Sequence, residues 1–485
     1  MDKWHTVMND LCSLSAREAL RKIKIKEISP LELVDACIAC IENANRSVNA
    51  MVATCYERAR DEARLAENAV MNGAELGALH GIPLGVKDLN VTKDLRTTFG
   101  SELHADWVPQ FDERMIAALR AEGAIVLGKT NTPEFGAGAN TTNRVYGATG
   151  NPFDITRTCG GSSGGSAVAL ACGMVPLATG SDTGGSLRTP ASFCGITSHR
   201  GTPGLVPSDR RTIGLSTYSV QGPMARTVDD TALMLSVMAG DSGIDPLSGP
   251  VDASSFADLP AVDLSQLKVA WSTDLGVAPV DRQIAEIFRA RMSTLGSSFA
   301  SFTEHNPELE TALETFWIIR GVHFLASHLD AYKTTPEKLG PNVTSNVEAA
   351  LQMTSSDIGW AMAEQTRLYR NFQSFFDHYD LLLCPGNAVS PFSLETLYCD
   401  EINGKKLSNY IEWLGIASAV TLTGHPVTML PIGLDHAGLP IGVQVVGPSR
   451  HKDAYTLACA AEIERTLQAH PSTKRPIPNW EHLAT

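Results

Sequence analysis

The chain has 485 residues, of which 43% are hydrophobic and 19% charged, a composition typical of an ordinary globular protein and unlike that of a disordered or fibrous one. Its net charge of -14 argues against a nucleic-acid-binding protein, which would need a basic face. The ten cysteines have no short, regular spacing, and no apolar run is long enough for a signal peptide or a membrane-spanning helix. These features predict a cytoplasmic protein without a membrane anchor.

The first predicted elements are helices. Ser29 is expected as an N-cap, with Pro30 at the first helical position and Glu32 placed to complete a capping box. Residues 56–70, rich in Ala, Glu and Arg, predict a second helix with a solvated face. Together these helices make residues 1–75 an N-terminal helical part.

From residue 81 onward, strand and helix patterns alternate. Residues 82–86 and 124–127 indicate short buried strands, with a helix around 115–122 between them. The alternation continues through three later apolar segments, at 167–170, 381–384 and 441–446. Such alternation is typical of an α/β fold, so we expect residues 1–485 to form one domain. Its centre should be a large mixed, twisted sheet covered on both faces by helices.

The segment 251–371 has a helical pattern and few glycine motifs. We expect it to be a helical insertion that caps the sheet and shapes a substrate cavity. Selectivity for the substrate would then reside largely in this segment.

Two sequence patterns, one for a phosphate-binding loop and one for a zinc site, occur in the chain without the structural context that such sites require. Residues 123–130 fit the phosphate-loop pattern G-x-x-x-x-G-K-[ST], but the four residues between the glycines are themselves the predicted strand, which leaves no flexible loop to hold phosphates. Cys37 and Cys40 form a C-x-x-C pair inside a predicted helix, and no second pair occurs at zinc-site spacing. The sequence therefore predicts no metal and no organic cofactor.

Two glycine-rich stretches carry the strongest functional signal. Glycine allows backbone N–H groups to approach a bound atom closely, as a site that stabilises an oxyanion requires. The small apolar run 167–171 follows the first stretch, so its N–H groups are expected at the start of a buried helix, where negative charge is favoured. Both stretches contain serines, which points to a serine hydrolase. The stretches are residues 158–166 (TCGGSSGGS) and 180–190 (GSDTGGSLRTP).

One interpretation makes Ser162 the nucleophile of an α/β-hydrolase esterase. Residues 160–164 fit the nucleophile-elbow pattern G-x-S-x-G, and histidines follow later in the chain. However, residues 151–154 have turn chemistry, so the strand that should lead into the elbow is not evident. This reading stays an alternative.

Six motifs in chain order support a more specific interpretation. They lie at residues 81–88, 128–135, 160–166, 180–188, 422–424 and 438–447. With them the chain resembles the amidase signature family, and the resemblance implies that family's fold and its Ser–cis-Ser–Lys triad. The matching positions are Ser186 as the nucleophile, Ser162 as the bridging serine after a cis peptide bond, and Lys87 as the base.

Three further residues of the two glycine-rich stretches are expected to support the triad. Ser163, in the first stretch, would assist the proton relay by hydrogen bonding, and Asp182 and Arg188, in the second, would pair to brace the loop that carries Ser186. The resemblance places the oxyanion hole at the N–H groups of Thr183, Gly184, Gly185 and Ser186.

Elementary chemistry supports a lysine base at position 87. A lysine accepts a proton only when neutral, so its ordinary pKa of about 10.4 must be lowered, and burial does this. Lys87 ends the apolar run 82–86, which predicts a buried amine. Asp88 would oppose the effect, but consecutive strand side chains point to opposite faces.

The expected partner is a small-molecule amide or carbamate, with no nucleic acid and no membrane. Carbamate or ester cleavage by the same triad remains open, because every step acts on the carbonyl group. Some relatives are glutamine amidase subunits of a transfer-RNA amidotransferase. Those subunits resemble Asn-Met-Asp-Glu-Phe where residues 131–135 are Asn-Thr-Pro-Glu-Phe, which favours a stand-alone amidase. The sequence leaves the oligomeric state open, with a homodimer as one option.

Overall fold

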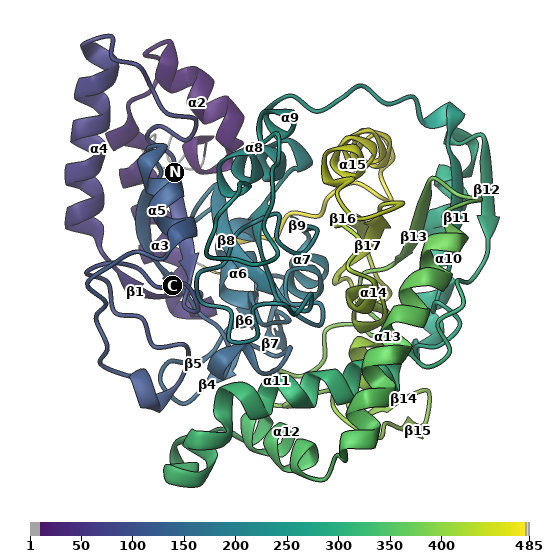
Figure 1. Cartoon of the computed structure of the whole chain (residues 1–485). Coiled ribbons are helices and arrows are strands. Elements are labelled where there is room, and N and C mark those ends of the chain that lie inside the picture. Colours follow the sequence, from purple (N-terminus) through teal and green to yellow (C-terminus); the bar gives the residue numbers. More distant parts are fainter. Residues whose placement is uncertain (1–9, 481–482, 484–485) are drawn as a thin grey trace.

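An eleven-stranded mixed sheet runs through the centre of the molecule (Figure 1). The computed structural model describes residues 10–480 and 483. The strand order is β1-β3-β2-β8-β10-β9-β16-β17-β13-β11-β12, parallel within β3-β2-β8 and within β13-β11-β12 and antiparallel elsewhere. Helices cover both faces, so the predicted α/β fold is confirmed. The strands of this sheet are β1 (Met51–Thr54), β2 (Pro83–Lys87), β3 (Ile125–Thr130), β8 (Leu177–Asp182), β9 (Thr197–Arg200), β10 (Val220–Ala225), β11 (Lys268–Trp271), β12 (Ser301–Glu304), β13 (Leu381–Pro385), β16 (Val427–Leu434) and β17 (Pro440–Val446).

Three two-stranded sheets and the helices surround this core. The small sheets pair β4 (Thr142–Asn143) with β5 (Gly147–Ala148), β6 (Gly150–Asn151) with β7 (Asp154–Thr158), and β14 (Glu401–Ile402) with β15 (Lys405–Lys406). The helices are α2 (Ala16–Lys24), α3 (Pro30–Val48), α4 (Tyr56–Met71), α5 (Arg114–Ala121), α6 (Gly164–Ala171), α7 (Arg188–Cys194), α8 (Val228–Met238), α9 (Ser254–Ala257), α10 (Arg282–Leu295), α11 (Ala312–Thr334), α12 (Pro341–Leu351), α13 (Ser355–Phe375), α14 (Gly415–Thr423) and α15 (Asp453–Gln468). None of the helices in the described part of the chain has the length and apolar character needed to cross a bilayer.

The N-terminal helices begin where the sequence predicts. The Ser29 side chain accepts a hydrogen bond from the Glu32 N–H, and the Glu32 side chain accepts one from the Ser29 N–H, so α3 starts with the expected capping box. Strand β1 lies between α3 and α4 and pairs antiparallel with β3. Residues 1–75 therefore contribute an edge strand to the main sheet as well as helices.

The segment 251–371 differs from the expected helical insertion. Its longest helices, α11 and α13, are present, but β11 and β12 join the edge of the main sheet. The prediction of a wholly helical segment is wrong in this respect. Each of the two strands has only four residues and includes exposed positions, so neither gives a recognisable apolar run.

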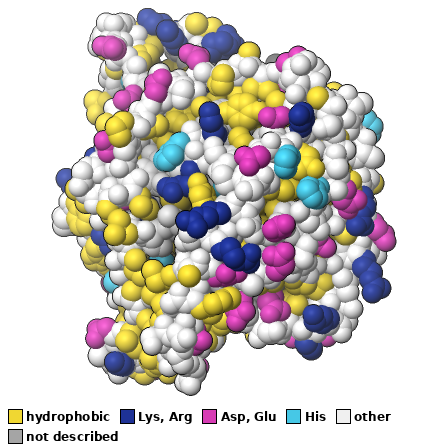
Figure 2. Space-filling view, turned by 45° about the vertical axis from the view of Figure 1, so that its right-hand side comes forward, with side chains coloured by type: hydrophobic (Ala, Val, Ile, Leu, Met, Phe, Trp, Pro, Cys, Tyr) yellow, Lys and Arg dark blue, Asp and Glu magenta, His cyan; other side chains and the backbone are white. Residues whose placement is uncertain are grey.

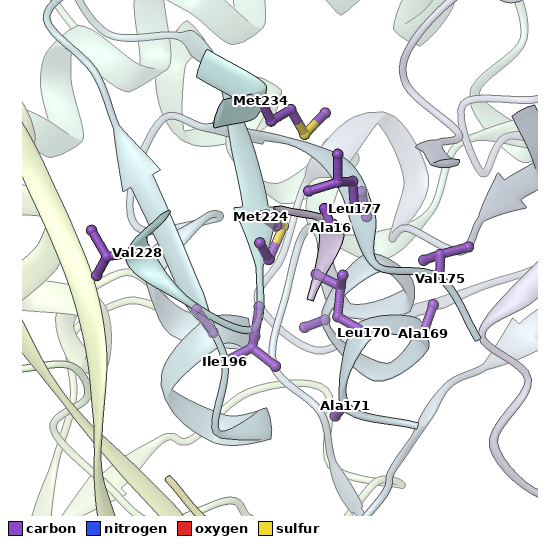
Figure 3. Packing of buried hydrophobic residues seen from close by; sticks show 14 of the residues in the cluster. Ala16, Ala169, Leu170, Ala171, Val175, Leu177, Ile196, Met224, Val228 and Met234 are labelled. Atoms are coloured by element: carbon purple, nitrogen blue, oxygen red, sulfur yellow. The ribbon is translucent and has the colours of Figure 1, made fainter. Parts of the chain in front are cut away.

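Helix α6 lies in the core, buried along its whole length. Small residues let it approach the sheet: a Cβ on Gly165 would lie 2.2 Å from the backbone nitrogen of Asn131, which follows β3. Leu170 of α6, Leu177 of β8 and Met224 of β10 belong to one apolar cluster (Figure 3). This close packing fixes the position of the loop that precedes α6.

Candidate active site

The Lys87 amine lies at the centre of a group of serine hydroxyls. Lys87 is the last residue of β2, it is fully buried, and its backbone N–H donates to Thr179 Oγ1 at 2.9 Å. Its Nζ lies 2.8 Å from Ser162 Oγ, 2.8 Å from Ser163 Oγ and 2.9 Å from Ser181 Oγ. The structure thus brings together the amine and the first glycine-rich loop as predicted.

Ser181 is a contact that the sequence reasoning missed. It follows Thr179 by two positions in β8, the strand parallel to β2, so both side chains face the same way. Thr179 holds the backbone of Lys87, and Ser181 holds its amine. The alternation of Thr179 and Ser181 along a buried strand is the sequence signal that could have identified this contact with Lys87.

Burial lowers the pKa of Lys87 to about 7, against a smaller raising effect of the Asp182 carboxylate. Asp88 points elsewhere, as the strand alternation predicts: its carboxylate accepts a hydrogen bond from the Thr98 hydroxyl at 2.6 Å and lies 3.9 Å from Lys129 Nζ. Near neutral pH a substantial fraction of Lys87 is therefore unprotonated.

Ser162 follows a cis peptide bond with Gly161, the geometry that the family resemblance implies. It is buried, and the backbone of Gly136 lies against it, since a Cβ there would come within 3.1 Å of Ser162 Oγ. The sequence showed no evident strand before this loop, but the structure has one: β7 begins at Asp154, directly after the turn. That strand pairs with β6 in a separate small sheet, and the Ser162 hydroxyl contacts a lysine, so the esterase alternative gains no support.

Ser186 lies between β8 and α7 at the wall of a cavity. Its backbone carbonyl accepts a hydrogen bond from the Ser163 N–H at 3.2 Å, which joins the two glycine-rich loops. Ser186 is partly exposed and, with Thr183 and Gly184, lines a cavity of about 230 Å³. The other walls come from Gly136 and its neighbours, the loop before β10, helix α11 and residues 410–414.

A buried ion-pair network braces the second glycine-rich loop, which carries Ser186. The Asp182 carboxylate accepts hydrogen bonds from the N–H groups of Gly185 and Leu187 at 3.0 and 3.1 Å. It also pairs with Arg188 at 2.9 Å and with Arg200 at 3.1 Å, and all three charged side chains are buried. Burial alone would raise the pKa of Asp182, but the two guanidinium groups outweigh burial and hold this pKa below its usual range. The sequence reasoning missed Arg200, which enters from β9.

Replacing Asp182 by Asn should destabilise the protein strongly. The change leaves two buried guanidinium groups without their shared carboxylate, and removing one partner of a buried pair typically costs about 3–5 kcal/mol. Urea unfolding at pH 7 would measure this loss. The matched control is Asp400→Asn in the exposed pair with Lys406, where water screens the charges and the loss of stability should be much smaller. Equal effects of the two changes would contradict the bracing role.

The two rejected motifs have structural roles. Lys129, in the phosphate-loop match, lies in β3, is fully buried, and its amine donates to Asn90 O and Thr92 Oγ1. Cys37 and Cys40 lie in α3 as free thiols. Within residues 10–480, no three His, Cys, Asp or Glu side chains are grouped in a way that could hold a metal ion.

Comparison with known proteins identifies the family of this chain. The Amidase family profile matches residues 32–456. The chain belongs to the amidase signature family. The acylamidase of Rhodococcus erythropolis is 33% identical over 455 residues, which cover 93% of this chain and 95% of that one. This amidase is also 32% identical to a glutamyl-tRNA(Gln) amidotransferase subunit from Geobacillus kaustophilus, over 91% of this chain and 95% of that one.

A solved structure extends the likeness to the fold. A bacterial aryl acylamidase of the amidase signature family superposes with a TM-score of 0.87 at 28% identity, covering 93% of this chain and 96% of that one. The protein is therefore an amide-hydrolysing enzyme of this family.

Proposed function

We propose that this amidase hydrolyses the C–N bond of a small-molecule amide through an acyl-enzyme on Ser186, with Ser162 as the proton relay and Lys87 as the base. The observation that carries the proposal is the 2.8 Å contact between a fully buried Lys87 amine and the Ser162 hydroxyl. A base must be largely neutral to accept a proton, and a pKa near 7 meets this requirement.

The hydrogen bonds around the amine favour proton flow from Ser162. A neutral amine has two protons and one lone pair. The Ser163 hydroxyl donates to the Ser181 carbonyl at 3.3 Å, so its oxygen is available to accept from Lys87. Donation to Ser163 and Ser181 uses both amine protons and leaves the lone pair for the Ser162 hydroxyl.

The catalytic cycle follows from this arrangement. Lys87 takes the Ser162 proton, Ser162 takes the Ser186 proton, and Ser186 Oγ bonds to the substrate carbonyl carbon. The C–N bond then breaks, and the amine leaves with the proton returned from Lys87 through Ser162. Water attacks the acyl-enzyme, loses its proton along the same path, and releases the acid as Ser186 is reprotonated.

The oxyanion is proposed to bind at backbone N–H groups of the nucleophile loop. Thr183, Gly184 and Ser186 line the cavity, whereas the Gly185 N–H is committed to the Asp182 carboxylate. We therefore assign the donors to Thr183, Gly184 and Ser186, with Gly185 positioning the loop. Each such donor typically lowers the barrier by about 2.7–4 kcal/mol.

Carbamate or ester cleavage by the same residues is a second candidate, since these steps act on the carbonyl and not on the leaving group. A stand-alone amidase is favoured over an amidotransferase subunit by Thr132 and Pro133, where those subunits resemble Met and Asp. The likeness to acylamidases in both sequence and structure supports the same choice.

A substrate panel tests the proposal. An anilide, a primary amide, a carbamate and an ester would be incubated with the enzyme, with Ser186→Ala as the blank. We expect amine release from at least one amide by the wild type and none above background by the variant. Hydrolysis of esters alone would contradict the amidase assignment, and equal release by both proteins would contradict the role of Ser186.

The pH profile of kcat/KM should report Lys87. Below its pKa the lysine is protonated and inactive, so we expect activity to rise with pH, approach a limit above a midpoint of about 7, and stay high in mild alkali. His323 and His328 line the cavity, but burial lowers the pKa of each to about 4, so they do not produce this limb. A midpoint near 10, as for an ordinary lysine, would contradict the assignment.

A further inference from the structure

The cavity beside Ser186 has a basic lining in an acidic protein. Arg210, Arg211 and Arg320 line it, and no Asp or Glu from the described part of the chain does. The whole chain carries a net charge of -14, and the face in Figure 2 has acidic and basic side chains near one another. The positive lining is therefore local to the cavity and favours a negatively charged ligand.

Of the three arginines that line the cavity, Arg320 is the one whose charge a bound anion would stabilise most. It lies on α11 with only 7% of its surface exposed, and it forms no ion pair with a carboxylate anywhere in residues 10–480. Its hydrogen-bond partners are neutral: Nε donates to Asn346 Oδ1 at 3.1 Å, and Nη2 donates to the Tyr410 hydroxyl. A buried charge without a counter-charge is unfavourable, and a bound anion would relieve this.

The other two arginines have different environments. Arg211 pairs with the buried carboxylate of Asp245 at 3.1 Å, so its charge is already compensated. Arg210 is exposed to solvent, where water screens its charge. Arg320 alone among the three combines burial with the lack of a carboxylate partner.

The Arg320 guanidinium is held ready for a ligand. The Arg320 Cζ atom lies over the Phe324 ring, 4.6 Å from the ring centroid, and over the Tyr410 ring, 5.5 Å from its centroid. Asn346 Nδ2 also donates to the Tyr410 hydroxyl at 3.0 Å. The remaining nitrogen, Nη1, has no hydrogen-bond partner in the described structure. Unlike the buried unpaired side-chain atoms of the described residues, it can be reached by solvent. A planar, fixed guanidinium with a free N–H edge suits a carboxylate.

We propose that the substrate is an amide that also carries a carboxylate, which binds Arg320 while Ser186 attacks the amide carbonyl. This inference rests on the proposed function and specifies its substrate class. Either the monoamide of a dicarboxylic acid or an N-acyl amino acid fits, and water converts the former into a dicarboxylate and an amine.

Matched substrates test this assignment. The anilides of succinic and glutaric acid, each with a free carboxylate, would be compared with neutral analogues that end in a carboxamide, with aniline release as the readout. N-acetyl amino acids and their amides form a second arm that places the carboxylate on the amine side. A charge-assisted hydrogen bond should favour the carboxylate about 10- to 100-fold in kcat/KM in one arm.

Variants of the cavity arginines test which one binds the carboxylate. Arg320→Met should abolish this preference, measured as the ratio of kcat/KM for the charged and the neutral substrate, Arg320→Lys should retain part of it, and Arg210→Met should leave it intact. Equal rates for charged and neutral substrates in the wild type, or a preference that survives Arg320→Met or disappears with Arg210→Met, would overturn the proposal.

A binding measurement separates this inference from the proposed function. Calorimetry of glutarate with Ser186→Ala needs no hydrolysis, and adding Arg320→Met should weaken the affinity about 10- to 100-fold. Unchanged affinity would overturn the Arg320 site even if Ser186 is the nucleophile. Strong binding without amide hydrolysis by the wild type would contradict the proposed function and leave the anion site supported.

Discussion

Replacing Ser186 by Ala is expected to lower kcat about a millionfold, the largest effect we predict. The variant keeps the backbone of the nucleophile loop but has no oxygen to bond with the substrate carbonyl. Loss of the nucleophile in other serine hydrolases has an effect of this size. Single-turnover kinetics with an anilide substrate would measure it.

Ser192→Ala is the matched control. Ser192 lies in α7, a few residues after Ser186, and its buried hydroxyl has no hydrogen-bond partner in the described structure. We expect this change to leave kcat nearly unaltered. A comparable loss in the two variants would mean that removing any hydroxyl from this region damages the loop, and the nucleophile assignment would fail.

Replacing Lys87 by Met should lower the rate of acylation by about 10²- to 10⁴-fold, the range typical of general-base catalysis. Methionine fills a similar volume but cannot accept the Ser162 proton. If the three groups act as a unit, as we propose, Lys87→Met combined with Ser186→Ala should be no slower than Ser186→Ala alone. Pre-steady-state amine release would measure the rate of acylation.

Lys129→Met is the control for removing a buried lysine. Lys129 lies in β3, the strand parallel to β2, and is as buried as Lys87, but its amine contacts Asn90 and Thr92. This change should reduce thermal stability and leave the rate of acylation nearly unchanged. A large loss of rate in Lys129→Met with full activity in Lys87→Met would reverse the assignment.

The sequence was most informative where motifs coincide with strong local constraints. Ser29 and Glu32 cap a helix by contacts within one turn, so the start of α3 was predictable. The closeness of Lys87 to Ser162 was predictable from the family motifs, although the two residues are 75 positions apart. Both predictions depend on short segments with distinctive residue types.

Contacts between distant segments without a motif were not predictable. Arg200 reaches Asp182 from β9, and Arg320 enters the cavity from the middle of α11. Neither arginine has a local pattern that separates it from a surface arginine. The short strand β11 was missed for a related reason, since pairing with β13 and β12, and not its own four residues, makes it a strand.

Peptide mass spectrometry of the enzyme quenched during turnover of a slow anilide tests the central claim most directly. If neutral Lys87 acts through Ser162 to activate Ser186, the acyl group will be found on the peptide that contains Ser186, and it will not accumulate in Lys87→Met. An acyl group on Ser162, or equal acylation of the Lys87→Met variant, would contradict this account.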